Sequence, residues 1–204
     1  MKPTPPDFDP IVYRDAHPDL RTLSDPELVA HFRHFGLAEG RVCSRITGRH
    51  DLAELVERGD RVLEIGPFTT PLVRGGHVKY FDILDGPGLL ERATRIGYPV
   101  AATPPIDFVS PTGDLSIVDG RFDAVVGSHV IEHQPDLIRH LRDVARILEP
   151  DGRYLLVVPD KRYCFDHFIP ESTIARVIEA HVESRRVHAV ASIIEHTALV
   201  THND

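Results

Sequence analysis

The sequence is poor in several residue types, and each shortage excludes a class of protein. Only two cysteines, Cys43 and Cys164, occur in the 204 residues, too few for a disulfide framework or for a site built from several thiolates. No apolar run approaches the roughly 18 residues that cross a bilayer. The N-terminal MKPTPPDFDP lacks the apolar centre of a signal peptide. We therefore expect a cytoplasmic protein with no membrane span.

Positive charge is scarce as well. Lys and Arg number 23 against 31 Asp and Glu, which gives a net charge of −8 with His neutral. Because phosphate backbones are bound by positively charged surfaces, we do not expect a nucleic acid as partner. What remains is ordinary globular composition, with 42% hydrophobic and 26% charged residues, enough for one α/β domain and a small appendage.

The N-terminal part has the pattern of a small helical module. Ser24 and Glu27 have the spacing of a capping box and predict that a helix begins at Ser24, and Gly36 is expected to end it. These residues are too few for an independent core. The prediction is therefore a helical module over residues 1–45 and a larger domain over residues 46–204.

In the larger part, short apolar runs alternate with single amphipathic stretches. We expect strands at 61–65, 78–84, 106–109, 122–127 and 153–159, and helices over 47–59, 88–96, 135–149 and within 171–200. This alternation predicts an α/β fold with a doubly wound, mostly parallel, Rossmann-like sheet. The last strand is too apolar for a half-exposed position. Ligands bind such sheets beyond the carboxyl ends of the strands.

Two of these strand ends carry residues suited to a nucleoside. Gly66 follows the first strand directly, and without a Cβ it lets a ligand approach the backbone. Asp82, which ends the second strand, can accept two ribose hydroxyls. The loop from Gly66 to Pro71 lacks the further glycines of a pyrophosphate cradle, which argues against NAD or FAD. The alternative is that Gly66 only terminates a strand.

Four separated blocks resemble, in sequence and order, the class I S-adenosylmethionine-dependent methyltransferases, in particular the type 11-like subgroup. They read EIGP, YFDIL, GDLSIVDGRFDAVVGSHVIEH and LRDVARILEPDGRYLLVVPDKR, and the resemblance covers about residues 60–162. It implies S-adenosylmethionine as cofactor and methyl transfer to a small-molecule or glycan-linked acceptor.

The resemblance also implies which residues hold the cofactor: Glu64, Gly66, Pro67, Asp82, Asp114, Leu115 and Ser128. Glu64 and Gly66 would lie by its methionine end, Asp82 would hold the ribose hydroxyls, and Asp114 and Leu115 would flank the adenine. Thr69 and Thr70 are expected to meet its carboxylate, helped by the N-terminus of a following helix.

Two histidines after the fourth strand are the candidate catalytic residues. His129 is the first candidate and His133 the second, because an imidazole takes up a proton near neutral pH; Asp160 is a third. The segment from His129 to His133 also spells H-x-x-E-H, a zinc-peptidase pattern. Because a helix is expected to start only near Pro135, no metal ligand is predicted, and a zinc hydrolase is the less favoured alternative.

The N-terminal module resembles a short helical module found beside glycosyltransferases and methyltransferases of cell-surface polysaccharide synthesis. The residues that carry this resemblance are Phe8, Tyr13, Pro18, Leu20, His31, Phe32, Gly36, Glu39, Gly40 and Arg41. It supplies no catalytic residue, and it leaves open a non-catalytic nucleoside-binding or scaffold protein of polysaccharide synthesis.

The C-terminal region departs from the family, which normally adds two antiparallel strands after the fifth strand. Helices are expected there instead, so the domain over residues 46–204 is predicted to lack those strands. It is either a fragment or a reduced version, and its open sheet edge would pair with something else, such as a second copy in a homo-oligomer.

Overall fold

The computed structural model describes residue 4 and residues 8–46, 48–100 and 102–201. The chain forms two compact units, Met1–Leu55 and Val56–Asp204, and each is described by itself. The division lies later in the chain than the boundary expected between residues 45 and 46. No described helix is long and apolar enough to cross a membrane.

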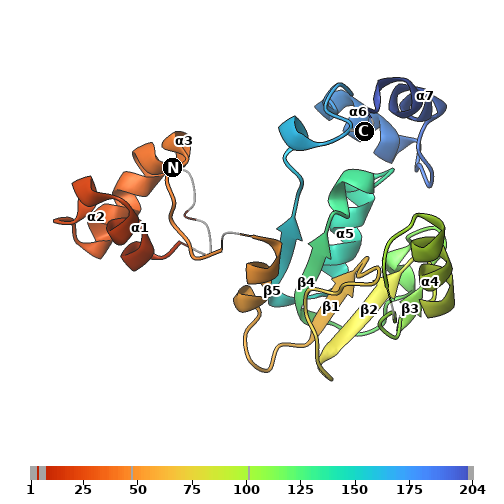
Figure 1. Cartoon of the computed structure of the whole chain (residues 1–204), viewed down its shortest axis with the longest axis horizontal. Coiled ribbons are helices and arrows are strands. Elements are labelled where there is room, and N and C mark those ends of the chain that lie inside the picture. Colours follow the sequence, from red (N-terminus) through yellow and green to blue (C-terminus); the bar gives the residue numbers. More distant parts are fainter. Residues whose placement is uncertain (1–3, 5–7, 47, 101, 202–204) are drawn as a thin grey trace. The chain divides into compact units, whose positions relative to one another are not determined.

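The first unit is helical (Figure 1). Its elements are α1 (Pro10–Ala16), the 3-10 helix η1 (Pro18–Leu20), α2 (Asp25–His31), the π-helical turn η2 (Phe32–Gly36), α3 (Leu37–Glu39) and the 3-10 helix η3 (Arg49–Leu55). The capping box is confirmed, because the Glu27 carboxylate accepts the Ser24 amide at 2.8 Å. Of the helix expected over residues 47–59, the structure forms only the 3-10 helix η3. Residue 47 lies outside the described residues.

Gly36 does not end the second helix, contrary to the prediction. A Cβ at this position would overlap the Tyr13 hydroxyl, so the glycine permits a close approach between η2 and α1. The helical run continues through α3 and ends at Gly40, whose φ of +64° is left-handed. Tyr13 is fully buried and its hydroxyl hydrogen-bonds Nδ1 of His31 at 2.9 Å.

The second unit is a five-stranded parallel sheet flanked by helices (Figure 1). Its strands are β1 (Val62–Ile65), β2 (Val78–Asp82), β3 (Phe108–Val109), β4 (Phe122–Ser128) and β5 (Leu148–Val157). Their order is β3-β2-β1-β4-β5. The chain adds β2 and β3 on one side of β1 and then β4 and β5 on the other side, which confirms the doubly wound fold. A ligand crevice is expected at this reversal, between the ends of β1 and β4.

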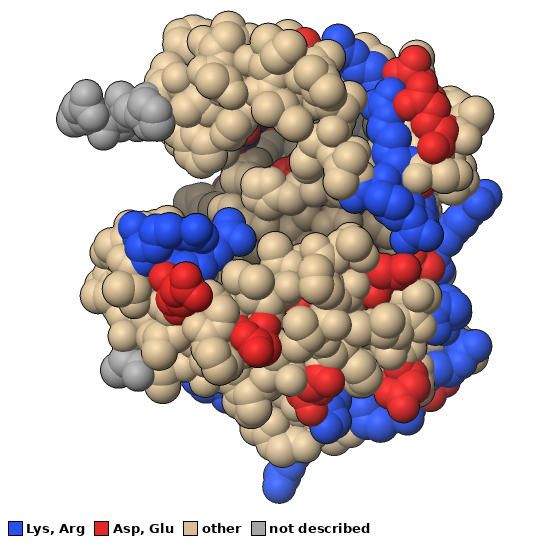
Figure 2. Space-filling view, turned by 90° about the vertical axis from the view of Figure 1, so that its right-hand side faces the viewer, with Lys and Arg blue, Asp and Glu red and all other residues tan. Residues whose placement is uncertain are grey.

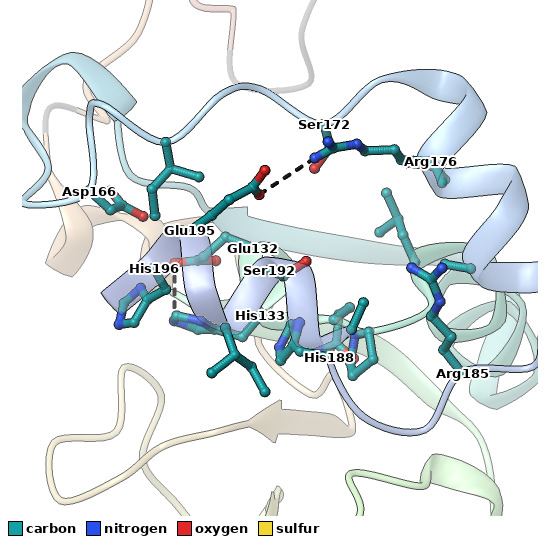
Figure 3. A pocket seen from close by; sticks show the side chains of 18 of the residues that line it. Glu132, His133, Asp166, Ser172, Arg176, Arg185, His188, Ser192, Glu195 and His196 are labelled. Atoms are coloured by element: carbon teal, nitrogen blue, oxygen red, sulfur yellow. Dashed lines mark ion pairs between the residues drawn. The ribbon is translucent and has the colours of Figure 1, made fainter. Parts of the chain in front are cut away.

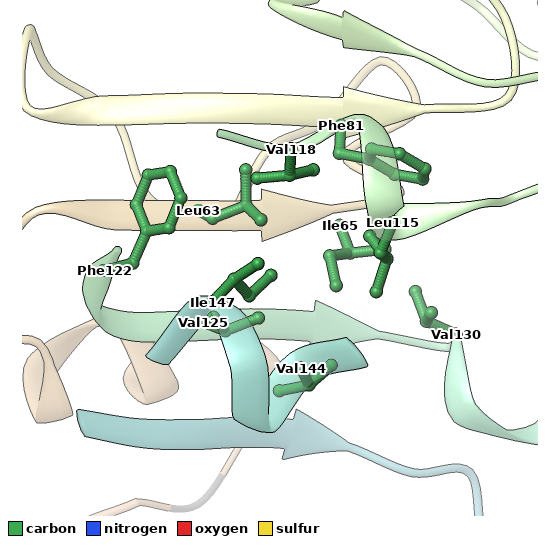
Figure 4. Packing of buried hydrophobic residues seen from close by; sticks show 10 residues of the cluster. All are labelled: Leu63, Ile65, Phe81, Leu115, Val118, Phe122, Val125, Val130, Val144 and Ile147. Carbon is green, nitrogen blue, oxygen red and sulfur yellow. The ribbon is translucent and has the colours of Figure 1, made fainter. Parts of the chain in front are cut away.

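Helices connect and follow the strands. They are α4 (Gly86–Arg95), α5 (Leu137–Ile147), α6 (Ile174–Val182) and α7 (Val190–Leu199), with the 3-10 turns η4 (Leu115–Ile117), η5 (Ile131–His133) and η6 (Lys161–Tyr163). Val144 and Ile147 of α5 pack on Leu63 and Val125 of the sheet (Figure 4). Because Asp136 accepts the Arg139 amide at 2.9 Å, α5 begins after Asp136 rather than at Pro135.

The expectation that the fifth strand is fully buried is wrong. β5 forms an edge of the sheet, and only Leu155 among its residues is buried. Pro150, Asp151 and Gly152 lie within β5 at an irregularity, where the pairing passes from Phe122 with Leu148 to Ala124 with Arg153. An apolar run predicts a buried strand only where a neighbouring strand covers it.

Candidate functional site

The candidate site lies where β1, β2, β3 and β4 end. Gly66 follows β1 with a φ of +67°, and its amide donates to the Phe81 carbonyl at 2.8 Å. A Cβ on Gly66 would lie 3.1 Å from Cγ2 of Val130, so the loops after β1 and β4 approach each other closely. Figure 2 shows a hollow between α6 and α7 above and α4 below, with acidic atoms inside it.

Asp82 joins three of these loops. It is 7% exposed at the end of β2, and its carboxylate accepts the amides of Ile83 at 2.7 Å and of Phe68 at 3.4 Å. Its carbonyl accepts the Ser110 amide at 3.0 Å, and the Ser110 hydroxyl accepts the Asp114 amide at 2.9 Å. Burial raises the pKa of Asp82 above its usual range.

Glu64 stabilises the loop after β1 through hydrogen bonds to its backbone. The side chain is 1% exposed, and its carboxylate oxygens accept the amides of Leu72 at 2.8 Å and Val73 at 3.0 Å. Pro67, in the same loop, is buried. These contacts give Glu64 a structural role in shaping the loop, and its place by the methionine end of a cofactor stays a prediction.

The connection between β1 and β2 contains no helix, although every residue in it is described. The expected helix N-terminus beside Thr69 and Thr70 is therefore wrong, because the segment after Pro71 soon reaches Gly75 and Gly76, which are poor helix formers. Thr69 is 6% exposed, and its hydroxyl oxygen has no hydrogen-bond partner among the residues that the structure describes. A buried polar atom without a partner is costly, and this one lies in the loop where a ligand is expected.

The loop after β3 presents Asp114, which caps η4. Its carboxylate accepts the Ser116 amide at 2.9 Å and lies 3.1 Å from Nη1 of Arg186, between α6 and α7. Hydrogen bonds from Ser116 and the charge of Arg186 lower the pKa of Asp114. Leu115 is 1% exposed in the core, so only its main chain can reach a ligand.

The candidate catalytic residues lie in the loop after β4. Ser128 is buried, and the following His129 has a φ of +56° and a half-exposed side chain. Nδ1 of His129 is 3.4 Å from Oε1 of Glu132, and Nε2 of His133 is 4.0 Å from the same oxygen. Glu132 therefore faces both candidate bases, a role that sequence reasoning missed.

Two weaker hypotheses fail on geometry and charge. His133 ends the single 3-10 turn η5, whereas His129 precedes it in a left-handed conformation, so the two do not share the helical face that zinc peptidases need. Among the residues that the structure describes, no three His, Cys, Asp or Glu side chains form a group suited to a metal. Hydrogen bonds from Arg162 lower the pKa of Asp160 to about 2, which makes it a weak base.

Comparison with known proteins decides the family. A family model described as a methyltransferase domain matches residues 30–199. The chain belongs to this methyltransferase family. The match covers all five strands of the methyltransferase domain, from β1 to β5.

Individual relatives match this methyltransferase chain more distantly. The uncharacterized methyltransferase YcgJ of Bacillus subtilis (strain 168) is 32% identical over 72 residues, 35% of this chain and 25% of that protein. Ribosomal protein L11 methylase from Lactobacillus delbrueckii subsp. bulgaricus aligns with a TM-score of 0.35 and 23% identity, over 65% of this chain and 66% of the other. The plantazolicin methyltransferase BamL aligns with a TM-score of 0.40 and 12% identity, over 92% and 72%. The chain thus spans a quarter of the curated relative.

A cavity of about 620 Å³ opens beside the β4 loop of the methyltransferase domain (Figure 3). Its walls come from η5, the start of α5, the segment after η6, and both C-terminal helices. The volume is within the range of small-molecule sites. Apolar lining residues are Pro135, Leu137, Phe165, Ile169, Pro170, Val177, Ala180, Ala189 and Ile193. No pattern in the sequence predicts this cavity, because the segments that form its walls are far apart along the chain.

Proposed function

We propose that this methyltransferase domain binds S-adenosylmethionine at the ends of β1, β2 and β3. The observation that carries the proposal is Asp82, a buried carboxylate bound to the loop after β1 and linked to the loop after β3. A carboxylate has about four acceptor positions, more than the three main-chain amides of Phe68, Ile83 and Leu84 fill. A ribose hydroxyl is a suitable donor for the remaining position.

Other features of the crevice suit the same ligand. Gly66 presents backbone without a Cβ where the loops after β1 and β4 meet. The unpartnered Thr69 hydroxyl offers a hydrogen bond to the polar end of the methionine part. Asp114 and the Leu115 main chain would flank the adenine. The Asp114 carboxylate would then contact both the adenine and Arg186.

S-adenosylmethionine, when bound, supplies a methyl group on a positively charged sulfur, which is already reactive. The protein's own residues therefore bind, orient the reactants and exclude water. An acceptor that carries a proton needs a base. We assign this role to His129 or His133, and Glu132 would stabilise the imidazolium that forms.

The acceptor is proposed to be a small molecule or a group linked to a glycan. The glycan context rests on the resemblance of the N-terminal module to modules of polysaccharide synthesis. The alternative, a non-catalytic nucleoside-binding or scaffold protein, is favoured by the helix-free loop after β1, which differs from the family's glycine-rich loop.

Calorimetric titration tests cofactor binding. S-adenosylmethionine and S-adenosylhomocysteine are titrated into the wild type, Asp82→Ala and the control Asp151→Asn, an exposed carboxylate in β5. Loss of hydrogen bonds to a charged group costs about 2 kcal/mol, so Asp82→Ala should bind about 30-fold more weakly and the control should match the wild type. A wild type that binds neither compound refutes the proposal, and binding without turnover of any acceptor assigns the chain to the non-catalytic alternative.

A further inference from the structure

The cavity between η5 and the C-terminal helices has an uneven set of charges. Three carboxylates line it, those of Glu132, Asp166 and Glu195, together with the guanidinium groups of Arg176 and Arg185. Figure 3 shows these side chains around the opening. Only those charges that are not already paired within the protein can attract a charged ligand.

Both guanidinium groups are engaged by carboxylates. Nη1 of Arg176 is 3.6 Å from Oε2 of Glu195, across the cavity wall. Arg185 is paired outside the lining, with Glu183 at 2.6 Å and Glu179 at 3.3 Å. The positive charge of each arginine is therefore already offset by a carboxylate, which weakens its attraction for an anionic ligand.

Two carboxylates are left to face a ligand. Asp166 has no ion-pair partner within the described part of the chain, and the partners of Glu132 are the imidazoles of His129 and His133. Among the described residues no Lys or Arg is paired with Glu132 or Asp166, so the cavity presents negative charge beside the apolar part of its wall.

We infer that this cavity binds the methyl acceptor and selects a small organic cation, a protonated amine attached to an apolar group. The inference rests on the proposed function for the assignment as acceptor site. The ammonium group would lie near Glu132 and Asp166, and the apolar part would contact Leu137, Ile169 and Ile193.

The position of Glu132 connects the cavity to the β4 loop. Its carboxylate lines the cavity and is also 3.4 Å from Nδ1 of His129, which directly follows the last residue of β4. An ammonium group held by Glu132 is therefore next to His129, the proposed base, which would take one of its protons. The nitrogen lone pair freed in this way would form the bond to the methyl carbon as the bond between that carbon and sulfur breaks. A phosphorylated or carboxylate-bearing acceptor would instead be repelled by Glu132 and Asp166.

Three probes of nearly equal shape test the charge preference: benzylammonium, benzyl alcohol and benzoate. Each is titrated into the full chain at pH 7 without cofactor, and binding is followed by calorimetry and by the imidazole proton resonances of His133, His188 and His196, which line the cavity. We expect benzylammonium to bind on the order of tenfold more tightly than benzyl alcohol, and benzoate not to saturate. The shifted resonances should be those of the three lining histidines.

Variants connect the preference to its residues. Asp166→Asn should reduce the advantage of benzylammonium, and the double variant with Glu132→Gln should abolish it, whereas Asp151→Asn should leave it unchanged. Circular dichroism verifies folding; if the double variant is unfolded, Asp166→Asn alone decides. Equal affinity for benzylammonium and benzyl alcohol, or a preference that survives in the folded variants, overturns the inference.

Failure of this inference is distinguishable from failure of the proposed function, because no cofactor is present in the titrations. Cofactor binding without the charge preference overturns the acceptor assignment alone. A charge preference in a chain that binds no S-adenosylmethionine overturns the proposed function, and with it the assignment of the cavity to a methyl acceptor.

Discussion

Replacement of Asp136 should loosen the attachment of α6 to α5 and destabilise the start of α5. The carboxylate is almost completely buried, accepts the Arg139 amide at 2.9 Å and lies 3.0 Å from Nδ1 of His181 in α6. Nη1 of Arg142 lies 3.0 Å from Nε2 of the same ring. Because a guanidinium only donates, Nε2 accepts this hydrogen bond, and Nδ1 donates to Asp136.

The magnitude follows from the two interactions that Asp136→Ala removes. Loss of an N-cap costs about 1 kcal/mol, and loss of a buried hydrogen bond to a charged group costs about 2 kcal/mol, so a decrease of about 3 kcal/mol in the free energy of unfolding is expected. His181→Ala removes only the second interaction. Asp136→Asn keeps a good cap and should fall between the wild type and Asp136→Ala.

Urea denaturation of the wild type, Asp136→Ala, His181→Ala and the double variant gives a coupling energy. A coupling of about 1 kcal/mol or more is expected for residues in direct contact. Additive effects, or Asp136→Ala no less stable than the wild type, would refute the reasoning.

Although burial raises the pKa of Asp136, the Arg139 amide and His181 outweigh it and lower that pKa. The ionised group therefore stabilises the fold above the ordinary Asp pKa, and this contribution is lost as the pH falls below that value.

Three further outcomes are expected. Tyr154→Phe should cost about 1–3 kcal/mol in unfolding free energy, measured in urea, because its hydroxyl is 2.8 Å from Nε2 of the buried His140. Burial lowers the pKa of His140 to about 4, so its imidazole proton resonances should keep their neutral positions below pH 6, and stability should decline as pH falls from about 6.5. Gly36→Ala should destabilise the helical module by about 1–3 kcal/mol, seen in a lower melting temperature, because its methyl overlaps Tyr13, and rescue by Tyr13→Phe would support this cause.

The parts of the fold that depend on local patterns could be predicted from the sequence. β1, β2 and β4 lie close to the predicted ranges because central parallel strands are continuous apolar runs. The capping box at Ser24 is likewise a local signal. The burial of β5 is not local, because it depends on whether another strand lies beside it, and the prediction there was wrong.

The candidate site shows the same difference. Asp82 could be identified because it ends a strand, and strand ends meet at one edge of a parallel sheet. Arg186, which pairs with Asp114 across 72 positions of sequence, and Glu132, which faces two histidines, carry no motif. Their roles depend on side-chain directions that only the folded chain defines.

The left-handed backbone of His129 has a thermodynamic consequence for the domain. A residue other than glycine in this conformation costs roughly 1 kcal/mol, and asparagine adopts it more readily than most. Exchange of His129 for glycine would therefore relieve the backbone strain after β4 and stabilise the fold, but it would remove the imidazole beside Glu132. Directed selection for thermal stability alone would favour glycine at this position, whereas the proposed role of His129 as a base requires the imidazole and therefore the strain.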